Sequence, residues 1–351
     1  MYDELTRWDN LLRAYRNASR GKRGQPNVAV FEYALEEELF QLQHELRTFS
    51  YRPGGYLSFP IHEPKRRLIS AAPFRDRVVH HALCQMIEPP WERRFIYDSY
   101  ANRVGKGTHR ALDRCQQFLR RYRYVLPCDI RQFFPSIDHA FLHQKLATEC
   151  QDDDILWLID EILQSGRDVL SEEYRMVYFA GDEPFAANRP RGLPIGNLTS
   201  QFWANVYLDS FDHFVKRSLR CRAYLRYVDD FLLFANDKAT LWQWKAAIEP
   251  RLAALRLTMH DNAAPRPTRE GLSFLGFRLF PQRRRLKREK GLYYRRKLRQ
   301  MQRQNRAGHL SYALIHESIR GWVAHVRYAN TIGLRKALFR PLRWAAYPEA
   351  T

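Results

Sequence analysis

The stretch YLRYVDDFLLF, residues 224–234, sets two adjacent carboxylates between two apolar arms that are rich in β-forming residues. Charged groups inside an apolar hairpin cost free energy unless they are paired or neutralised. Asp229 and Asp230 are therefore candidates for binding a cation. A plain turn with both side chains in water is the alternative, and the pair alone fits either equally well. The tight aromatic and aliphatic flanks favour the cation site.

A third carboxylate stands in YVLPCDIRQFFPSID, residues 124–138, where Asp129 ends an apolar strand. An isolated aspartate at such a place usually caps the next turn. Two strands of one sheet that both carry aspartates where the apolar run meets a turn can instead hold two divalent cations about 3.5–4 Å apart. Such a cation pair activates an attacking hydroxyl and neutralises a departing pyrophosphate, and the backbone carbonyl of Ile130 would complete one coordination shell.

Charge and composition restrict the class of protein. The chain of 351 residues carries 58 Lys and Arg against 38 Asp and Glu, a net charge of +20, which favours a nucleic-acid partner over an anionic membrane surface. Twelve of the 24 residues from 283 to 306 are Lys or Arg. The 45% of hydrophobic residues argues against disorder, and five scattered cysteines without a CxxC pair argue against zinc or a disulfide framework. Without a signal-peptide pattern or an apolar run of roughly 20 residues, we expect a cytoplasmic protein.

The periodicity of the apolar residues predicts alternating strands and helices around a sheet, an α/β or α+β core. We expect one helix to end near residue 20, a second from about 28 to 47, and a third closed by Pro89–Pro90. The basic segment 283–306 is predicted to be helical, and the residues after it form a small helical lobe.

Three motifs in order resemble the reverse transcriptases, above all the prokaryotic branch that includes group II introns and retrons. They are KRRLIS (65–70), the DI-x-x-FF run (129–134) and YVDD (227–230). The stretch LPIGNLTSQ (193–201) is similar to the reverse transcriptases of diversity-generating retroelements. Other branches have glutamine before that glycine and serine-proline after it, where this chain has Ile195 and Ser200–Gln201.

The resemblance implies an α+β chain with the right-hand polymerase fold of fingers, palm with an antiparallel sheet, and helical thumb. It implies N-terminal helices and fingers in residues 1–123 and a palm in residues 124–280, with part of the fingers at about 165–190. Residues 281–351 would be the basic helical thumb.

Site residues follow from the same resemblance. Asp129, Asp229 and Asp230 would be the catalytic triad, which with Ile130 binds two Mg²⁺ ions or, in their place, Mn²⁺. Lys65 and Arg67 would grip the incoming triphosphate, and Phe134 would be the steric gate against a 2′-hydroxyl. The other implied dNTP contacts are Ile195, Gly196 and Gln201. The implied template and primer contacts are Tyr227, Phe274, Leu275, Gly276, Arg295 and Arg296.

The loop from Gly192 to Asn197 would form a floor under the nascent base pair, where a Cβ at Gly192 or Gly196 would push the pair away. Ile195 offers shape without a directional hydrogen bond, so discrimination against mispairs should be loose.

One departure from the family pattern concerns LRLTMHDNAAPRPT, residues 255–268, where Ala263–Ala264 replace an expected Lys-Thr. That lysine is proposed to protonate the leaving pyrophosphate, and His260, Arg266 or a water would have to substitute.

The implied function is an RNA-directed DNA polymerase that makes error-prone cDNA in a diversity-generating retroelement. Its partners would be a template RNA, the RNA/DNA duplex, dNTPs and a small basic accessory protein, with no membrane. The alternative within polymerases is an antiviral-defence enzyme that copies a dedicated non-coding RNA. A catalytically inactive RNA-binding scaffold is the third hypothesis, supported only by the missing lysine.

Overall fold

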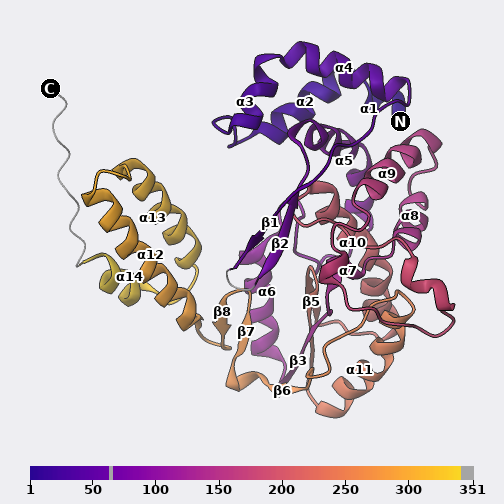
Figure 1. The fold of residues 1–351 in the computed structure, drawn as a ribbon. Helices are drawn as coiled ribbons and strands as arrows, with labels where there is room; N and C mark the ends of the chain where they lie inside the picture. The colour runs from indigo at the N-terminus through magenta and orange to yellow at the C-terminus, as the bar shows by residue number, and fades with distance from the viewer. Residues whose placement is uncertain (63–65, 341–351) are drawn as a thin grey trace. The chain divides into compact units, whose positions relative to one another are not determined.

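The computed structural model describes residues 1–62 and 66–340, which form helices and short antiparallel strands (Figure 1). The chain divides into two compact units. The first unit contains residues 1–105, 127–232 and 242–263, and the second contains residues 106–126, 233–241 and the described residues from 264 onward. This mixture of helices and antiparallel strands confirms the predicted α+β class.

The N-terminal part of the first unit is helical, with helices α1 (Tyr2–Leu5), α2 (Trp8–Ser19), α3 (Pro26–Tyr33), α4 (Leu35–Arg47) and α5 (Phe74–Arg94). Helix α2 buries the stripe Leu11, Ala14, Tyr15 and Ala18, and packs against α4 and α5. The predicted single helix from 28 to 47 is wrong. Ala34, with φ −110° and ψ 35°, leaves helical geometry and separates α3 from α4.

The prediction that the Pro89–Pro90 pair closes helix α5 is wrong, because the helix continues to Arg94. A proline lacks the N–H that would bond one turn back, but the rest of the helical turn can persist if packing holds it. Trp91 is 2% exposed, and its backbone carbonyl accepts a hydrogen bond from Phe95 N at 2.9 Å. Burial of this large ring keeps the last turn in place.

Strands β1 (Leu57–Ile61) and β2 (Arg67–Ala71) form an antiparallel hairpin with Leu57 opposite Ala71 and Ile61 opposite Arg67. All of β1 is exposed, whereas β2 turns Ser70 into the interior of the first unit.

A four-stranded sheet of order β4-β5-β3-β6 carries the predicted acidic motifs. Its strands are β3 (Tyr124–Asp129), β4 (Tyr224–Tyr227), β5 (Asp230–Ala235) and β6 (Arg266–Pro267). The helices of this part of the chain are α7 (Phe133–Ser136), α8 (His139–Ala147), α9 (Asp153–Ser165), α10 (Leu198–His213) and α11 (Lys238–Ala253). Short 3-10 turns cover Ser171–Glu173, Pro184–Asn188 and Thr268–Glu270, and a π-helix covers Phe214–Ser218. Helix α10 packs against α5 and α8 and is buried along nearly its whole length, so it forms the centre of the first unit.

The second unit combines helix α6 (Thr108–Arg121) with an antiparallel sheet and a helical lobe. The sheet is β7 (Leu272–Phe274), β8 (Phe277–Leu279) and β9 (Arg284–Leu286), and the lobe is α12 (Arg288–Arg306), α13 (Tyr312–Val326) and α14 (Ile332–Phe339). Tyr294, Leu298, Met301, Ile315 and Leu338 are its core. The prediction that residues 283–306 are helical throughout is wrong at the start, because residues 284–286 pair with β8.

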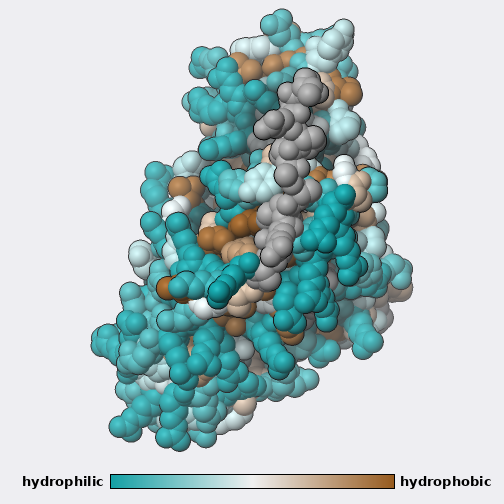
Figure 2. All heavy atoms as spheres, turned by 90° about the vertical axis from the view of Figure 1, so that its left-hand side faces the viewer, coloured by the Kyte–Doolittle hydropathy of each residue, from teal (hydrophilic) through white to brown (hydrophobic). Residues whose placement is uncertain are grey.

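Figure 2 shows a face on which hydrophilic side chains predominate, with smaller hydrophobic patches between them. Helix α12 accounts for much of the exposed charge of the second unit through Arg288, Arg295, Arg296, Lys297, Arg299, Arg303 and Arg306. Among the described helices, none is long and apolar enough to cross a bilayer.

Candidate active site

The turn between β4 and β5 contains Val228 and Asp229, and its backbone is strained. Val228 has φ 59°, a left-handed conformation that a β-branched residue rarely adopts. Two-residue hairpin loops with a positive φ at the first position ordinarily place glycine there. Strain of this kind costs about 1–3 kcal/mol and gathers at functional sites, where the surroundings hold it.

The end of β3 meets this turn through backbone contacts. Ile130 N donates to Asp229 O at 3.3 Å, and His260 N donates to Asp129 O at 3.0 Å. Arg131 N donates to Thr258 O at 2.8 Å on the other side. The hydrogen bond from Ile130 to Asp229 joins the end of β3 to the turn before β5, so Asp129 and Asp229 lie close together.

The two carboxylates interact electrostatically. Burial raises the pKa of the Asp229 carboxyl, the charge of Asp129 raises it further, and the guanidinium of Arg67 acts in the opposite direction. A divalent cation between the two would remove this repulsion, and carboxylate and carbonyl oxygens are the donors that Mg²⁺ prefers. The donor set of Asp129, Asp229 and the Ile130 carbonyl fits such an ion.

Within residues 1–62 and 66–340 no group of three or more acidic, histidine or cysteine side chains is arranged to hold a metal ion. Asp230, the first residue of β5, is half-buried and has interactions of its own within the chain. Coordination at this site would therefore need the Ile130 carbonyl, substrate oxygens and water beside the two carboxylates.

His260 lies next to this pair, with Nε2 3.6 Å from Oδ2 of Asp129. Among the groups considered as substitutes for the missing lysine, this imidazole is the one that the first unit places at the aspartates. Arg266 is an exposed residue of β6 in the second unit.

The loop 192–197 is bonded along strand β2. Ser70 N donates to Ile195 O at 2.8 Å, and the amide of Asn197 accepts from Ala72 N at 3.1 Å and donates to Ser70 O at 3.0 Å. Since β2 also carries Arg67, the loop and this predicted triphosphate contact share one support.

The backbone conformation of the loop also favours glycine. Gly192 and Gly196 have φ 95° and 124°, which glycine alone adopts easily. A Cβ at Gly192 would point at Leu170 and Pro135, both at 3.7 Å, and a Cβ at Gly196 would meet Ile69 at 3.1 Å. That a Cβ at either position would also push the nascent base pair away stays a prediction.

Phe134, the predicted steric gate, is half-buried in α7 and lies beside the loop, where its carbonyl accepts a hydrogen bond from Leu193 N at 3.0 Å. Ile195 is half-buried, and half-buried Gln201 lies in the first turn of α10, with its N–H donating to Asn197 O. Lys65 lies outside the described residues.

The predicted template and primer contacts divide between the units. Tyr227 ends β4 directly before the strained turn. Leu275 and Gly276 form the β7–β8 turn with φ 46° and 84°, whereas Phe274 is buried in the second unit. Arg295 and Arg296 are exposed on α12.

A buried polar group that sequence reasoning missed lies under the turn. Arg226 is fully buried and bonds to Asp212, to Asn205 and to the carbonyl of Val228. The available signal was an arginine alternating with Tyr224 on one face of an apolar strand, together with polar residues in a helix that is otherwise apolar.

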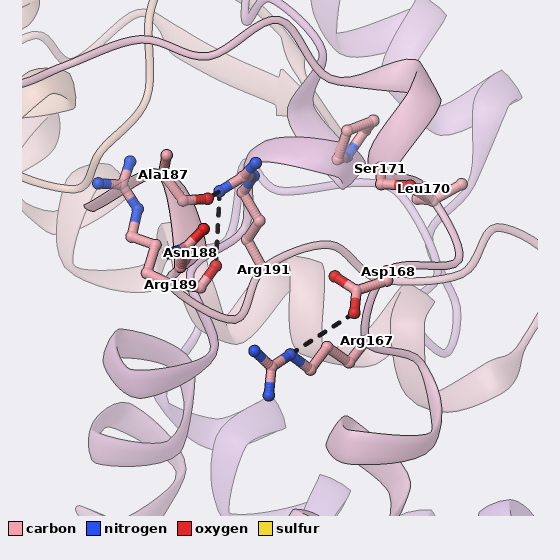
Figure 3. Close-up of a pocket in the computed structure, with 9 residues that line it drawn as sticks. Arg167, Asp168, Leu170, Ser171, Ala187, Asn188, Arg189 and Arg191 are labelled. Atoms are coloured by element: carbon pink, nitrogen blue, oxygen red, sulfur yellow. Dashed lines mark hydrogen bonds and ion pairs between the residues drawn. The ribbon is translucent and has the colours of Figure 1, made fainter. Parts of the chain in front are cut away.

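A cavity of about 250 Å³ lies behind the loop and is shown in Figure 3. Arg191 donates to the carbonyls of Ala187 and Arg189 across it, and Arg167 lies 3.7 Å from Asp168. Arg189 reaches Asp138 and Asp182, which Arg256 also contacts. The contacts of Arg189 and Arg191 hold the segment before Gly192 in shape, and the cavity borders this segment.

A family model for reverse transcriptase (RNA-dependent DNA polymerase) matches residues 61–279, more than half of the chain. Protein YkfC of Escherichia coli K12 is 25% identical over 300 residues, which cover 73% of this chain and 75% of that protein. The group II intron-encoded protein LtrA of Lactococcus lactis is 24% identical over 221 residues, 61% of this chain and 35% of LtrA.

Solved structures resemble the chain more weakly. Apo telomerase from Candida tropicalis has a TM-score of 0.49 at 11% identity, covering 67% of this chain and 49% of that chain. A partial Cas6-RT-Cas1–Cas2 complex has a TM-score of 0.39 at 18% identity, covering 72% of this chain and 42% of that chain. At these scores neither structure adds to the assignment.

The matched residues 61–279 include strand β2, the sheet strands that carry the aspartates and the loop 192–197. The chain therefore belongs to the reverse transcriptase family of RNA-directed DNA polymerases, which have the right-hand polymerase fold.

Proposed function

We propose that the chain makes cDNA from a template RNA at a site formed by Asp129 and Asp229. The observation that supports this most is the approach of two strand ends, joined by the Ile130–Asp229 hydrogen bond, where burial and the charge of Asp129 raise the pKa of Asp229. An acidic pair in this arrangement suits cations and disfavours a purely structural role.

Two Mg²⁺ ions, or Mn²⁺ in their place, would be held by Asp129, Asp229 and the Ile130 carbonyl, with Asp230 in support. When bound, such ions supply activation of the primer 3′-hydroxyl and neutralisation of the leaving pyrophosphate. The carboxylates would hold the ions, and the strained turn sets the direction of the Asp229 side chain.

The remaining residues would bind and orient the substrates. Arg67 would grip the triphosphate with its planar fork and Lys65 as a point charge, while Phe134 would exclude a 2′-hydroxyl. Ile195, Gly196 and Gln201 would line the nascent base pair. On the primer side, the assigned contacts are Tyr227, Phe274, Leu275, Gly276, Arg295 and Arg296.

Primer extension on an RNA template with Mg²⁺ tests the mechanism. We expect Asp229→Ala to reduce extension to background, because one of the two carboxylates is lost. Asp154→Ala removes an exposed carboxylate of the same unit and should extend like the unaltered protein. Primer extension by the Asp229→Ala variant would contradict the assigned site.

We further propose that the enzyme serves a diversity-generating retroelement in the cytoplasm of a prokaryotic host, where it copies inaccurately with a small basic accessory protein. Ile195 carries this assignment, since the motif around it departs from other branches at that residue. An aliphatic side chain leaves the nascent pair without a directional hydrogen bond.

Ile195→Gln should therefore lower misincorporation, above all opposite template adenine. The error spectrum is read by sequencing cDNA made by the two enzymes from one RNA, with Ile195→Leu as an aliphatic control that should keep the original spectrum. An unchanged spectrum for Ile195→Gln would defeat the proposal. In the genome, a template repeat beside a near-identical repeat at the end of a coding gene supports the retroelement role, and its absence favours the defence role.

A further inference from the structure

Arg226 is a fully buried arginine whose guanidinium has three partners. Its Nε lies 2.8 Å from Oδ1 of Asp212, and its Nη2 lies 2.7 Å from Oδ2 of the same carboxylate. Its Nη1 donates to Oδ1 of Asn205 at 3.2 Å and to the carbonyl oxygen of Val228 at 3.0 Å. The hydroxyl of Tyr224 donates to Oδ1 of Asp212 at 2.6 Å, which fixes the carboxylate from another side.

The bond to Val228 matters because Val228 is the strained residue of the turn that carries Asp229. Its φ of 59° persists only if neighbouring groups determine it. Both carbonyls of the turn are held, that of Val228 by Arg226 and that of Asp229 by Ile130 N. Without Arg226 the Val228 peptide would lose the contact that opposes relaxation of the turn.

The partners of Arg226 place this hold on helix α10. Asn205 and Asp212 are seven residues apart, about two turns, and so share one face of that helix. Helix α10 begins directly after Asn197, which bonds the loop 192–197 to strand β2. Helix α10 therefore follows the loop 192–197 directly at its start and binds Arg226 further along, through Asn205 and Asp212.

We propose that Arg226 is a positioning residue, which holds the Val228–Asp229 turn in its strained conformation and keeps the Asp229 carboxylate in register with the loop 192–197 through helix α10. This inference rests on the proposed function of Asp129 and Asp229. Burying an arginine–aspartate pair contributes little to stability, since apolar replacements are often neutral or better. The third partner, the turn carbonyl, gives this pair a role beyond stability.

Arg226→Lys separates the two roles. A lysine nitrogen keeps a charge for Asp212 but lacks the rigid fork that reaches Asp212 and Val228 together. We expect kcat for primer extension to fall about 10–100-fold with little change in KM for dNTP, and Mn²⁺ affinity to weaken about tenfold, as for other residues that orient metal ligands. Mn²⁺ affinity is measured from the electron paramagnetic resonance signal of the free ion.

Val228→Gly supplies the rescue. Glycine adopts a positive φ without strain, so the turn needs less support. Adding Val228→Gly to Arg226→Lys should restore part of the lost Mn²⁺ affinity and part of kcat. A purely structural role for Arg226 would not produce this recovery.

Arg94→Lys is the matched control, because Arg94 pairs with the buried Asp209 on the same helix at 2.7 Å and has no bond to the turn. It should leave Mn²⁺ affinity unchanged. An equal loss in Arg94→Lys, or unchanged affinity and kcat in Arg226→Lys, would overturn the proposal. If Arg226→Lys does not fold, Asp212→Asn is read in the same way, with a smaller loss expected.

Failure of the proposed function gives a different pattern. In that case Asp229→Ala still extends primers, while the Mn²⁺ titrations of Arg226→Lys and its rescue variant continue to decide whether Arg226 holds the turn.

Discussion

Two fully buried basic side chains of the first unit, Arg226 and His80, have opposite surroundings. Arg226 keeps its charge because Asp212 lies within hydrogen-bond distance on α10. His80, on α5, has no hydrogen-bond partner at either ring nitrogen among the described residues. Burial lowers the pKa of His80 to about 3, so the ring stays neutral where a histidine in water would take up a proton.

This difference predicts a pH dependence of stability. The unfolded chain protonates His80 below a pH of about 6.5, whereas the folded chain does so only near 3. The unfolding free energy contributed by this residue is therefore complete above about pH 6.5 and is lost as the pH falls toward 3, by up to about 1.4 kcal/mol per pH unit. His80→Leu should remove this loss. Nearby His81, whose pKa is lowered to about 4, acts in the same direction, and Glu88, raised to about 7, acts in the opposite one.

Urea unfolding at about pH 7.5 and about pH 5 measures the effect. His80→Leu should be at least as stable as the unaltered chain at the higher pH and should lose about 2 kcal/mol less between the two. His44→Leu, at an exposed histidine of α4, is the control. An identical pH dependence in His80→Leu and the unaltered chain would contradict the assigned burial.

The sequence was informative at this scale where chemistry is local. Asp229 and Asp230 could be recognised from the sequence because charge inside an apolar hairpin is rare. The partnership of Arg226 with Asp212 could not be predicted, because the two are 14 residues apart and meet only after α10 packs under β4. The strain at Val228 has no signal in the sequence, which places valine where glycine is usual.

At the scale of the elements, the attachment of the loop 192–197 to β2 joins two predicted parts of the nucleotide site. Asn197 is buried, accepts from Ala72 N and donates to Ser70 O and to Pro194 O. The contact holds β2, with Arg67, against the loop that contains Ile195.

Asn197→Asp should weaken this attachment, because a carboxylate keeps the acceptor for Ala72 but loses both amide donors. Two buried carbonyls then lack a partner, at a cost of about 1–3 kcal/mol each. We expect KM for dNTP to rise about tenfold or more, with a smaller fall in kcat. Steady-state primer extension measures both, and Asn17→Asp, at an exposed residue bonded to Gln85, should change neither. A fall in kcat with an unchanged KM would contradict this role.

The misplaced element boundaries have physical causes. The Pro89–Pro90 pair is a strong helix terminator in isolation, but the burial of Trp91 outweighs it. Residues 284–286 share the basic composition of α12, yet pairing with β8 draws them into a sheet. In both places tertiary packing sets the boundary of the element, and the periodicity of the sequence carries no information about that packing.

At the scale of the whole molecule, the α+β class and the family followed from the order of the motifs. How the chain is divided into fingers, palm and thumb stays a prediction, because the resemblance supplied those boundaries. The net charge of +20 favours polyanionic partners without saying which surface binds them. Helix α12, with one exposed face of arginines and a buried face that packs on α13 and α14, is the surface that the thumb assignment selects.

Replacing Arg295 and Arg296 by alanine tests that surface. If each neutralises one phosphate of the RNA/DNA duplex, their loss should weaken binding for every sequence alike and reduce the slope of log affinity against log salt by about two. Fluorescence anisotropy with a labelled duplex between about 50 and about 200 mM KCl gives the slope. Arg16→Ala with Arg20→Ala removes two exposed arginines from the N-terminal helices, and there the slope should not change. Equal reductions in both pairs would mean that the charge of the chain acts as a diffuse field, and an unchanged slope for Arg295 and Arg296 would remove α12 from the nucleic-acid surface.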